Sequence, residues 1–463
     1  MTYGYKDTYL LDVNFGYTGS ENFQAGRRFG FFPSIAGGWV PTNYKWMKDH
    51  LSWLNFFKIR ASHGSVGNDQ ISGTRFPYIT RINENAPAGW GGTEGGIQET
   101  VIGADNLMWE KSIKSDIGIE GRLFHEKVSF VLDFFQDRRD GIFQQRAQIP
   151  NYVGLVNLPY GNVGKMKSWG SDGNISYTHD FRKDLSLTLR GNFTYSTNEI
   201  ENWEQAYPKY NYQRYSNFPV NVIRGYIASG LFKDEQDVKS SPKQSFGGFK
   251  VMPGDIKYKD VNGDGQINTD DQVVLSYPTY PRLMYGFGAD FRYKDLTVGI
   301  LFKGTGDTDF FHVGYTYWDG YSWQTNGIGY TPFHGQEAGN VLTILADPKN
   351  HWTPASYSGD PATENPNARF PRLSYGYNAN NSQLSTFWKG NSKYLRLQEI
   401  TLNYNWKNKA FQALGLTSID LQVVGNNLYV WDQVDLWDPE QAHQNGRAYP
   451  IPARLTFQVY LNF

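Results

Sequence analysis

Residues 260–271 carry oxygen-bearing side chains at the spacing of a calcium-binding loop. Counted from the first residue, positions 1, 3, 5, 7, 9 and 12 are Asp260, Asn262, Asp264, Gln266, Asn268 and Asp271. In a loop of this kind the oxygens converge on one hard cation, the seventh residue gives its backbone carbonyl, and a glycine at the sixth position permits the sharp turn. Gly265 occupies that sixth position. The pattern predicts a bound Ca²⁺ ion with a structural role.

Two features set this loop apart from an EF-hand. Asp271 stands at the twelfth position in place of Glu, as in dockerin-like loops, and its shorter side chain makes bidentate closure harder. No helix–loop–helix pattern surrounds the stretch. Ile267, at position 8, is expected to anchor the loop by packing. The alternative is a turn rich in Asn, Asp and Gly whose residues only favour tight backbone angles.

Motifs for enzymatic chemistry are missing from the sequence. Gly304 and Gly306 follow a strand-like segment, but Asp307 comes next and no helix opens there to cradle a phosphate. The eight His residues show no metal-ligand spacing such as HExxH, and the absence of Cys excludes thiol catalysis, disulfides and Cys-based zinc sites. We therefore expect a protein that is not an enzyme.

Composition excludes other classes. The formal net charge is −1 and no basic block is present, which argues against nucleic-acid binding. Mean hydropathy is −0.57, and no run of 18 apolar residues exists from which a transmembrane helix could form. A β-barrel wall hides its apolar residues in alternate positions, so low mean hydropathy remains compatible with a membrane protein.

The final segment, Arg454–Phe463, has the alternation of a transmembrane strand. Its apolar residues share one face and its polar residues share the other; the apolar set is Leu455, Phe457, Val459, Leu461 and Phe463. About ten residues of strict alternation are typical of a barrel strand between lipid and a polar lumen.

The same alternation recurs in 8–17, 128–134, 185–195, 285–293 and 400–406. Leu395 and Leu397 are out of phase with Ile400, which predicts a β-bulge near Gln398–Glu399. A soluble β-sandwich also alternates. Its water-facing side, however, usually carries more Lys and Glu than the Ser, Thr, Asn and Gly found here.

Connection lengths give an independent signal. Short turns are expected at Phe124–Glu126, Asp180–Asp184 and Lys294–Asp295. Long connections are expected at Gly67–Met108, Arg146–Asn162, Asn198–Arg282, Asp307–Asn391 and Trp431–Tyr449. Strict alternation of short and long connections is typical of outer-membrane barrels, with short periplasmic turns and long extracellular loops. We expect about twelve strands, with Met1–Lys6 in a periplasmic turn.

Several segments resemble one family closely. These are Lys6–Tyr17, Lys58–Asn68, Asn162–Gly170, Gly225–Phe232, Pro253–Asp271, Tyr394–Tyr404, Gly425–Val430 and the final strand. In order and spacing they resemble the SusC/RagA family of TonB-dependent outer-membrane transporters along essentially the whole chain. The resemblance implies an all-β fold: part of a transmembrane antiparallel β-barrel, with long extracellular loops, in the Gram-negative outer membrane.

The resemblance covers only the C-terminal part of such a transporter. Residues 1–463 have no counterpart of the family's TonB box, plug domain or early barrel strands, and no signal peptide precedes Lys6. Transporters of this type have twenty-two strands around a plugged lumen, so about ten strands would be missing. A truncated gene model or a split chain would explain this, and a separate smaller barrel is the alternative.

The resemblance also implies nutrient import. Members take up glycans, oligosaccharides or peptides, powered by TonB through the N-terminal part, and a SusD-like surface lipoprotein closes them as a lid. Candidate contacts to a carbohydrate or peptide ligand are aromatic residues in the long loops: Trp90, Tyr315, Tyr317, Trp318, Trp323 and Trp352. The alternative for each ring is packing within the loops or an aromatic belt at the lipid headgroups.

Other residues are expected to mark the barrel wall. Trp39, Trp53, Trp406 and Tyr293 lie near predicted periplasmic strand ends and are interpreted as girdle residues. Arg190, Arg292, Asp133 and Asp290 are expected to face the lumen, where they line the transport chamber, contact a plug, or pair with one another.

Two functions from other classes stay open. A soluble glycan-binding or glycan-active β-protein would be soluble without detergent, and a passive porin would conduct ions without a lid. The sequence does not identify the cargo, because such scaffolds place specificity in loops and partners.

Overall fold

The computed structural model describes the chain except for residues 72–74, 87–94, 156, 279, 313–315, 319–322, 326–343, 345–346, 374–377, 435 and 445–447. One large antiparallel sheet dominates it, with thirteen strands in the order β1-β2-β3-β4-β7-β8-β9-β10-β17-β18-β23-β24-β25. The strands are β1 (Thr2–Tyr5), β2 (Tyr9–Gly19), β3 (Phe29–Trp39), β4 (Leu54–Asn68), β7 (Glu110–Leu123), β8 (Val128–Gln145), β9 (Tyr160–Arg182), β10 (Leu185–Asn202), β17 (Leu283–Tyr293), β18 (Leu296–Gly306), β23 (Tyr394–Trp406), β24 (Ser418–Asp432) and β25 (Arg454–Asn462).

Twelve of these strands are long, as the sequence predicts, and the thirteenth is short. Thr2–Tyr5, which we expected in a turn, forms β1 and pairs with β2. The turn lies instead at Lys6 and Asp7, both of which have positive φ, and the Thr8 amide donates to the Tyr5 carbonyl at 3.0 Å. Positive φ at both central residues matches the twist of a two-residue hairpin, which explains why the turn lies there.

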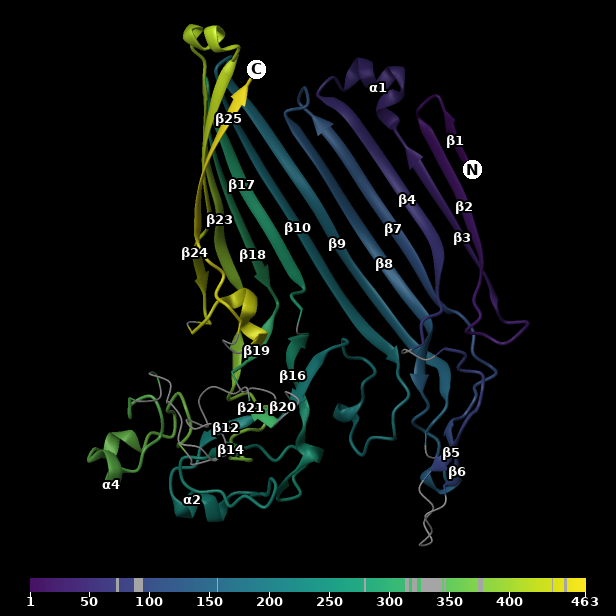
Figure 1. Ribbon diagram of the computed structural model, residues 1–463, viewed down its shortest axis with the longest axis vertical. Helices are drawn as coiled ribbons and strands as arrows, with labels where there is room; N and C mark the ends of the chain where they lie inside the picture. Colours follow the sequence, from purple (N-terminus) through teal and green to yellow (C-terminus); the bar gives the residue numbers. More distant parts are fainter. Residues whose placement is uncertain are drawn as a thin grey trace.

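The connections divide between the two ends of the sheet, as Figure 1 shows. At one end β7–β8, β9–β10 and β17–β18 are joined by the predicted short turns. At the other end lie the long connections. Strict alternation fails at β3–β4, where residues 40–53 include the 3₁₀ helix η1 (Pro41–Asn43) and helix α1 (Lys45–His50). It also fails at β23–β24, where residues 407–417 include η6 (Lys409–Leu414).

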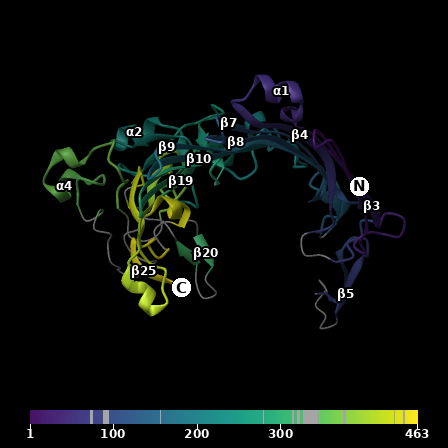
Figure 2. The ribbon, with the colours of Figure 1, turned by 90° about the horizontal axis from the view of Figure 1, so that it is seen from above.

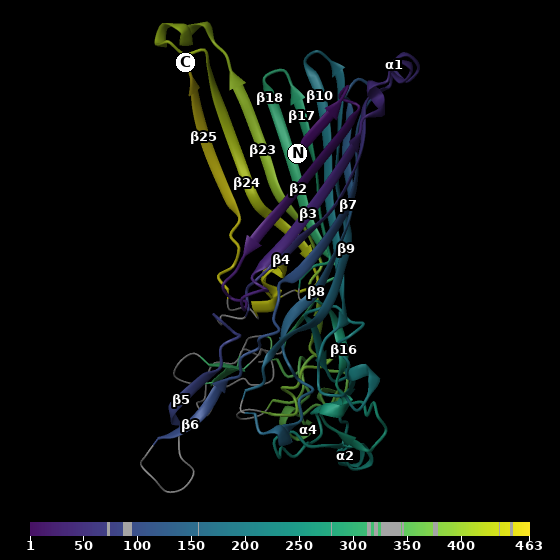
Figure 3. The ribbon, with the colours of Figure 1, turned by 90° about the vertical axis from the view of Figure 1, so that its right-hand side faces the viewer.

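The sheet curves into an open arc when seen from above (Figure 2), with β1 and β25 at its two edges. Neighbouring strands pair antiparallel from β2 to β25, with register shifts in five of the strand pairs. The predicted bulge is confirmed at Gln398, because the pairing with β18 passes from Glu399 directly to Leu397. Figure 3 shows the loop end extending well beyond the strands.

One face of the sheet carries large apolar side chains that nothing in the described chain covers. Phe15 and Phe457 are each 72% exposed, and Leu455 is 63% exposed. A face of this kind fits the hydrocarbon of a bilayer. The expected girdle residues Trp39, Trp53, Trp406 and Tyr293 lie exposed at the short-turn end.

The described residues include no helix that is long and apolar enough to cross a membrane.

The long connections contain their own small elements. The hairpin of β5 (Arg81–Ala86) and β6 (Gly96–Val101) belongs to the connection from β4 to β7 and projects beyond the long strands (Figure 3). Among the described residues, five more two-stranded sheets, two short α-helices and several 3₁₀ helices occupy the rest. The strands are β11 (Val222–Gly225), β12 (Ala228–Leu231), β13 (Lys243–Gln244), β14 (Ile256–Tyr258), β15 (Gln266–Ile267), β16 (Val273–Pro278), β19 (Asp309–Phe311), β20 (Thr316–Trp318), β21 (Trp323–Thr325) and β22 (Lys389–Asn391); β11 pairs with β16, β12 with β14, β13 with β15, β19 with β22 and β20 with β21. The helices are α2 (Glu235–Ser240), α4 (Ala355–Ser358), η2 (Asn151–Val153), η3 (Asn211–Gln213), η4 (Thr269–Asp271), η5 (Pro361–Thr363) and η7 (Pro439–Gln444).

Two long connections share one hydrophobic core. Residues 203–282 contribute Ile256 and Tyr258, and residues 307–393 contribute Phe370 and Trp388, all of them at most 3% exposed. We call this unit the loop domain. Its apolar residues point inward as in a soluble protein, whereas those of the sheet point outward.

Candidate functional site

The polar face of the sheet carries a network of charges centred on Arg60 of β4. The Arg60 guanidinium lies 3.1 Å from Asp116 and 3.0 Å from Glu120, both on β7, and 2.6 Å from Asp133 on β8. Farther along, Arg190 of β10 lies 3.2 Å from Asp290 of β17. Asp290 and Arg190 therefore pair across adjacent strands, and Asp133 pairs with Arg60 two strands away. This face is polar and internally compensated, as the wall of an aqueous lumen requires.

The predicted calcium loop lies in the loop domain. Asp260 accepts hydrogen bonds from the Gly263 amide at 2.6 Å and from the Gly265 amide at 2.7 Å. Both glycines have positive φ, near 80°, which a side chain would disfavour. Ile267 is 2% exposed within the core, so its predicted anchoring role is confirmed.

The C-terminal end of the loop is held by hydrogen bonds within the loop. Asp271 is fully buried and accepts from the Val261 amide at 2.8 Å and the Asn268 amide at 2.9 Å. Among the described residues no three His, Cys, Asp or Glu side chains come together as a metal cluster. Asp264 accepts from the Gln266 backbone amide at 2.9 Å and from the Asn262 side-chain amide at 3.1 Å. The loop backbone therefore has the required sharp turns, but its carboxylates accept hydrogen bonds from amides instead of converging on one point.

Asp270, next to the last predicted ligand, connects the loop to another segment. Its carboxylate lies 2.8 Å from the Lys209 ammonium, and this hydrogen bond lowers the pKa of Asp270 below its ordinary value. The Tyr212 hydroxyl donates to the Asp270 carbonyl at 2.6 Å. The calcium-loop segment is therefore fixed from both its core side and its solvent side.

The predicted ligand aromatics are only partly described. Trp90 and Tyr315 lie outside the described residues. The backbones of Tyr317, Trp318 and Trp323 form β20 and β21, but their side chains lie outside the description. Trp352 is 5% exposed in the core of the loop domain, which favours the packing interpretation over ligand contact for this ring.

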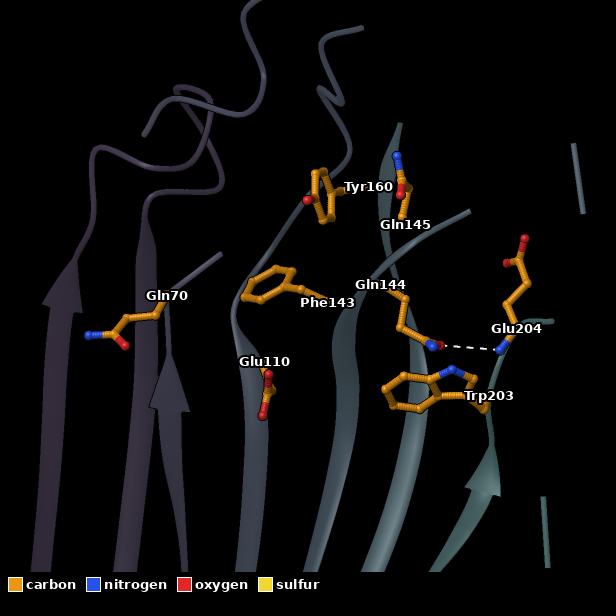
Figure 4. A pocket seen from close by; sticks show the side chains of 8 residues that line it. All are labelled: Gln70, Glu110, Phe143, Gln144, Gln145, Tyr160, Trp203 and Glu204. Carbon is orange, nitrogen blue, oxygen red and sulfur yellow. Dashed lines mark hydrogen bonds between the residues drawn. The ribbon is translucent and has the colours of Figure 1, made fainter. Parts of the chain in front are cut away.

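A cavity that the sequence analysis did not single out lies where five consecutive long strands meet the loops. Its volume is about 440 Å³. Figure 4 shows its lining: Gln70, Glu110, Phe143, Gln144, Gln145, Tyr160, Trp203 and Glu204. These residues lie just beyond β4, at the start of β7, at the end of β8, at the start of β9 and just beyond β10. Only strand pairing brings them together, so no local sequence motif could reveal them.

The two carboxylates of this cavity have different surroundings. Glu204 lies 2.7 Å from Arg146 and accepts from the amides of Ala147 and Gln148, each at 3.0 Å. Glu110 is 8% exposed and accepts from the Asn68 side-chain amide at 3.4 Å. Glu204 is thus neutralised, while Glu110 has no ion-pair partner among the described residues.

A curved antiparallel sheet with an apolar outer face, a polar lumenal face and long loops at one end defines an outer-membrane β-barrel wall. The family model described as TonB dependent receptor-like, beta-barrel matches residues 2–332. The chain therefore belongs to the TonB-dependent receptor β-barrel family, whose members lie in the Gram-negative outer membrane.

Known relatives agree with this assignment. The chain is 25% identical over 493 residues to TonB-dependent receptor P26 of Formosa agariphila, with 100% of this chain and 45% of P26 covered. It is 22% identical over 479 residues to TonB-dependent receptor SusC of Bacteroides thetaiotaomicron, with 100% of this chain and 43% of SusC covered. A chain of the RagAB peptide transporter has the same fold, with a TM-score of 0.72, 20% identity, and coverage of 100% of this chain and 47% of that chain. The chain thus spans less than half the length of these relatives.

Proposed function

We propose that this chain forms part of the barrel of a SusC/RagA-type importer. The importer takes up glycans, oligosaccharides or peptides in complex with a SusD-like surface lipoprotein. TonB drives it through the plug and TonB box in the N-terminal part of the importer. The observation that carries the proposal is the family match over residues 2–332, which runs through the lumenal wall and into the long connections.

The polar lumenal wall supports transport. Its charges are paired across strands, as in the contacts of Arg60. The relatives named SusC and RagAB have similar identities to the chain, 22% and 20%. Both cargo classes therefore stay in the proposal.

Deletion of the gene in its natural host tests the function. We expect slower growth on one class of cargo, either particular glycans or peptide mixtures, and restoration by the intact gene. A tagged full-length protein should co-purify with a surface lipoprotein. Growth that is unchanged on every cargo would contradict the importer, and uptake that persists without TonB would favour a passive porin.

We also propose that residues 260–271 bind Ca²⁺. The six oxygen-bearing positions, the positive φ of Gly263 and Gly265, and the anchoring of Ile267 support it. On binding, the ion would replace backbone amides as the partner of Asp260, Asp264 and Asp271. Its role would be to hold the loop domain in one arrangement at the cell surface.

Calcium binding is tested on the full-length importer by limited proteolysis of the loop domain with Ca²⁺ or with EDTA. A ligand at 100 times its dissociation constant stabilises a fold by about 2.7 kcal/mol, so cleavage should slow in Ca²⁺. The double substitution Asp260→Asn and Asp264→Asn should remove this protection. Glu235→Gln, an exposed change on α2, is the control and should keep it. Equal cleavage of the unaltered protein in Ca²⁺ and EDTA would refute the site.

A further inference from the structure

The cavity at the loop ends of β4, β7, β8, β9 and β10 combines aromatic rings with one unneutralised carboxylate. Phe143, Tyr160 and Trp203 supply the rings, and Glu110 supplies the charge (Figure 4). We propose that this cavity binds a cationic group of the cargo, a primary ammonium or a guanidinium. The inference rests on the proposed import function and narrows the cargo that this function would accept.

Burial of Glu110 is the first step of the argument. An ionised carboxylate that leaves water must be paired or hydrogen-bonded, because its desolvation costs several kcal/mol. Asn68 offers one long hydrogen bond of 3.4 Å, and no cation pairs with Glu110 among the described residues. Among the residues that the structure describes, Glu110 therefore lacks the kind of partner that Glu204 has in Arg146.

The aromatic lining is the second step. A cation over the face of Trp, Tyr or Phe is attracted by the ring quadrupole, and Trp is the strongest of the three. Figure 4 shows the Trp203 ring turned into the cavity on the side opposite Gln70, with Phe143 and Tyr160 between them. A cation in the space would meet rings and a carboxylate together, which is the chemistry of ammonium recognition.

The amides complete the site. Gln70 and Gln145 are exposed around the cavity, and both can accept as well as donate hydrogen bonds. Gln144 is buried and its side-chain oxygen accepts from the Glu204 amide at 3.2 Å, which fixes the segment that carries Trp203. The position of Trp203 is thus fixed by a hydrogen bond between the end of β8 and the segment just beyond β10.

The cavity is large enough for one chemical group of the cargo, such as a side chain or a sugar ring, but not for a whole peptide or oligosaccharide. About 440 Å³ lies near the lower limit of small-molecule pockets, which span roughly 300–1,000 Å³. One side chain of a peptide or one sugar ring fills such a space. A lysine, an arginine, a peptide amino terminus and an amino sugar share the required charge.

Binding of four probes to the purified full-length transporter tests the proposal. The probes are tetralysine, its fully acetylated analogue, a glucosamine tetramer and its N-acetylated analogue, measured by calorimetry at low and high salt. We expect the free-amine form of at least one pair to bind about tenfold or more tightly than its acetylated form, because hydrogen bonds to charged groups contribute roughly 1.5–3 kcal/mol. The pair that shows the difference identifies a peptide or an amino sugar as the source of the cation.

Substitutions assign the effect to the cavity. Glu110→Gln keeps the shape and should abolish the preference for free amines, whereas Glu84→Gln, an exposed change on β5, should leave it intact. Trp203→Leu should weaken amine binding roughly threefold to thirtyfold, and Trp203→Phe should retain more of it. Heat-dependent gel migration confirms that each variant forms a barrel, and Trp203→Leu carries the test if Glu110→Gln does not fold.

Three results would overturn the proposal: equal affinity for amine and acetylated probes, no binding of any probe, or an amine preference that survives Glu110→Gln. These differ from failure of the import function, which is a deletion strain with unchanged growth on all cargo. If the unaltered transporter imports its cargo normally but shows no amine preference, the import function stands and only the cation site is refuted.

Discussion

The barrel wall and the loop domain place the same kinds of residue on opposite sides. On the wall, Phe457 is 72% exposed and Ile35 is 50% exposed, while Arg60 and its carboxylate partners face the lumen. In the loop domain, Ile256 is fully buried and Trp388 is 1% exposed. The wall therefore depends on lipid to cover its apolar residues, and the loop domain covers its own. Substitutions in the two regions should respond to different conditions.

The largest effect is expected from Asp255→Ala in the loop domain. Asp255 is fully buried, lies 2.8 Å from the Arg372 side chain and accepts from the side-chain amides of Asn378 and Asn381. Removing one partner of a buried ion pair costs about 3–5 kcal/mol because the other charge is left unpaired. Hydrogen exchange should show the two long connections opening together while the strands stay protected.

The double variant Asp255→Leu and Arg372→Met is the control for this prediction. Replacing both charges by apolar groups should recover part of the lost stability. Opening of only one connection in Asp255→Ala would contradict the single shared core.

A matched isoleucine pair is the next test of the comparison. Ile256→Ala removes buried methyl groups from a core and should destabilise the loop domain by about 2–5 kcal/mol. Ile35→Ala on β3 changes a half-exposed position that lipid can refill, so we expect a much smaller effect. Hydrogen exchange of the loop domain at increasing denaturant measures the effect of Ile256→Ala. Heat-dependent gel migration of the barrel measures the effect of Ile35→Ala. Equal effects would remove the distinction between the regions.

A charge on the apolar face tests the wall directly. Phe457→Arg on β25 should cost about 2–4 kcal/mol if the residue lies near the bilayer midplane, and less toward an interface. Gln458→Arg, the neighbouring position on the polar face, should cost little because it faces water. Folding into lipid vesicles at increasing urea gives both values. A larger loss for Gln458→Arg would reverse the assignment of the two faces.

The sequence was sufficient for the wall because its pattern is local. Period-two alternation and the connection lengths together predict about twelve strands, and the phase change between Leu397 and Ile400 predicts the bulge at Gln398. Thr2–Tyr5 was assigned wrongly because a four-residue strand has too few alternations to be separated from a turn. Lys6 and Asp7 both have positive φ, but a Lys-Asp pair does not predict a tight hairpin turn from sequence as an Asn-Gly pair would.

The loop-end cavity and the loop domain were not predictable in the same way. Glu110 and Trp203 are distant in sequence and meet only because β7, β8, β9 and β10 pair in register. Trp352 looked like a ligand contact because a long connection was expected to expose its aromatics, but a core shared with residues 203–282 buries it. Burial that comes from contacts between distant segments produces no periodic pattern of apolar residues in the sequence, so it could not be predicted.

The smallest expected effect is a pH dependence confined to the loop domain. His351 is 7% exposed, and burial lowers the pKa of its imidazole below the ordinary value of 6.5. The folded domain therefore favours the neutral ring, so this contribution to stability is complete above pH 6.5 and is lost as the pH falls below 6.5 toward the folded-state pKa. Hydrogen exchange of the loop domain should accelerate over that range while exchange of the strands does not change. His351→Gln should remove the acceleration, and the substitution His63→Gln at an exposed wall position should retain it. If acid instead loosened the wall first, the pH response would belong to the lumenal charges and the loop domain would not be the acid-sensitive region.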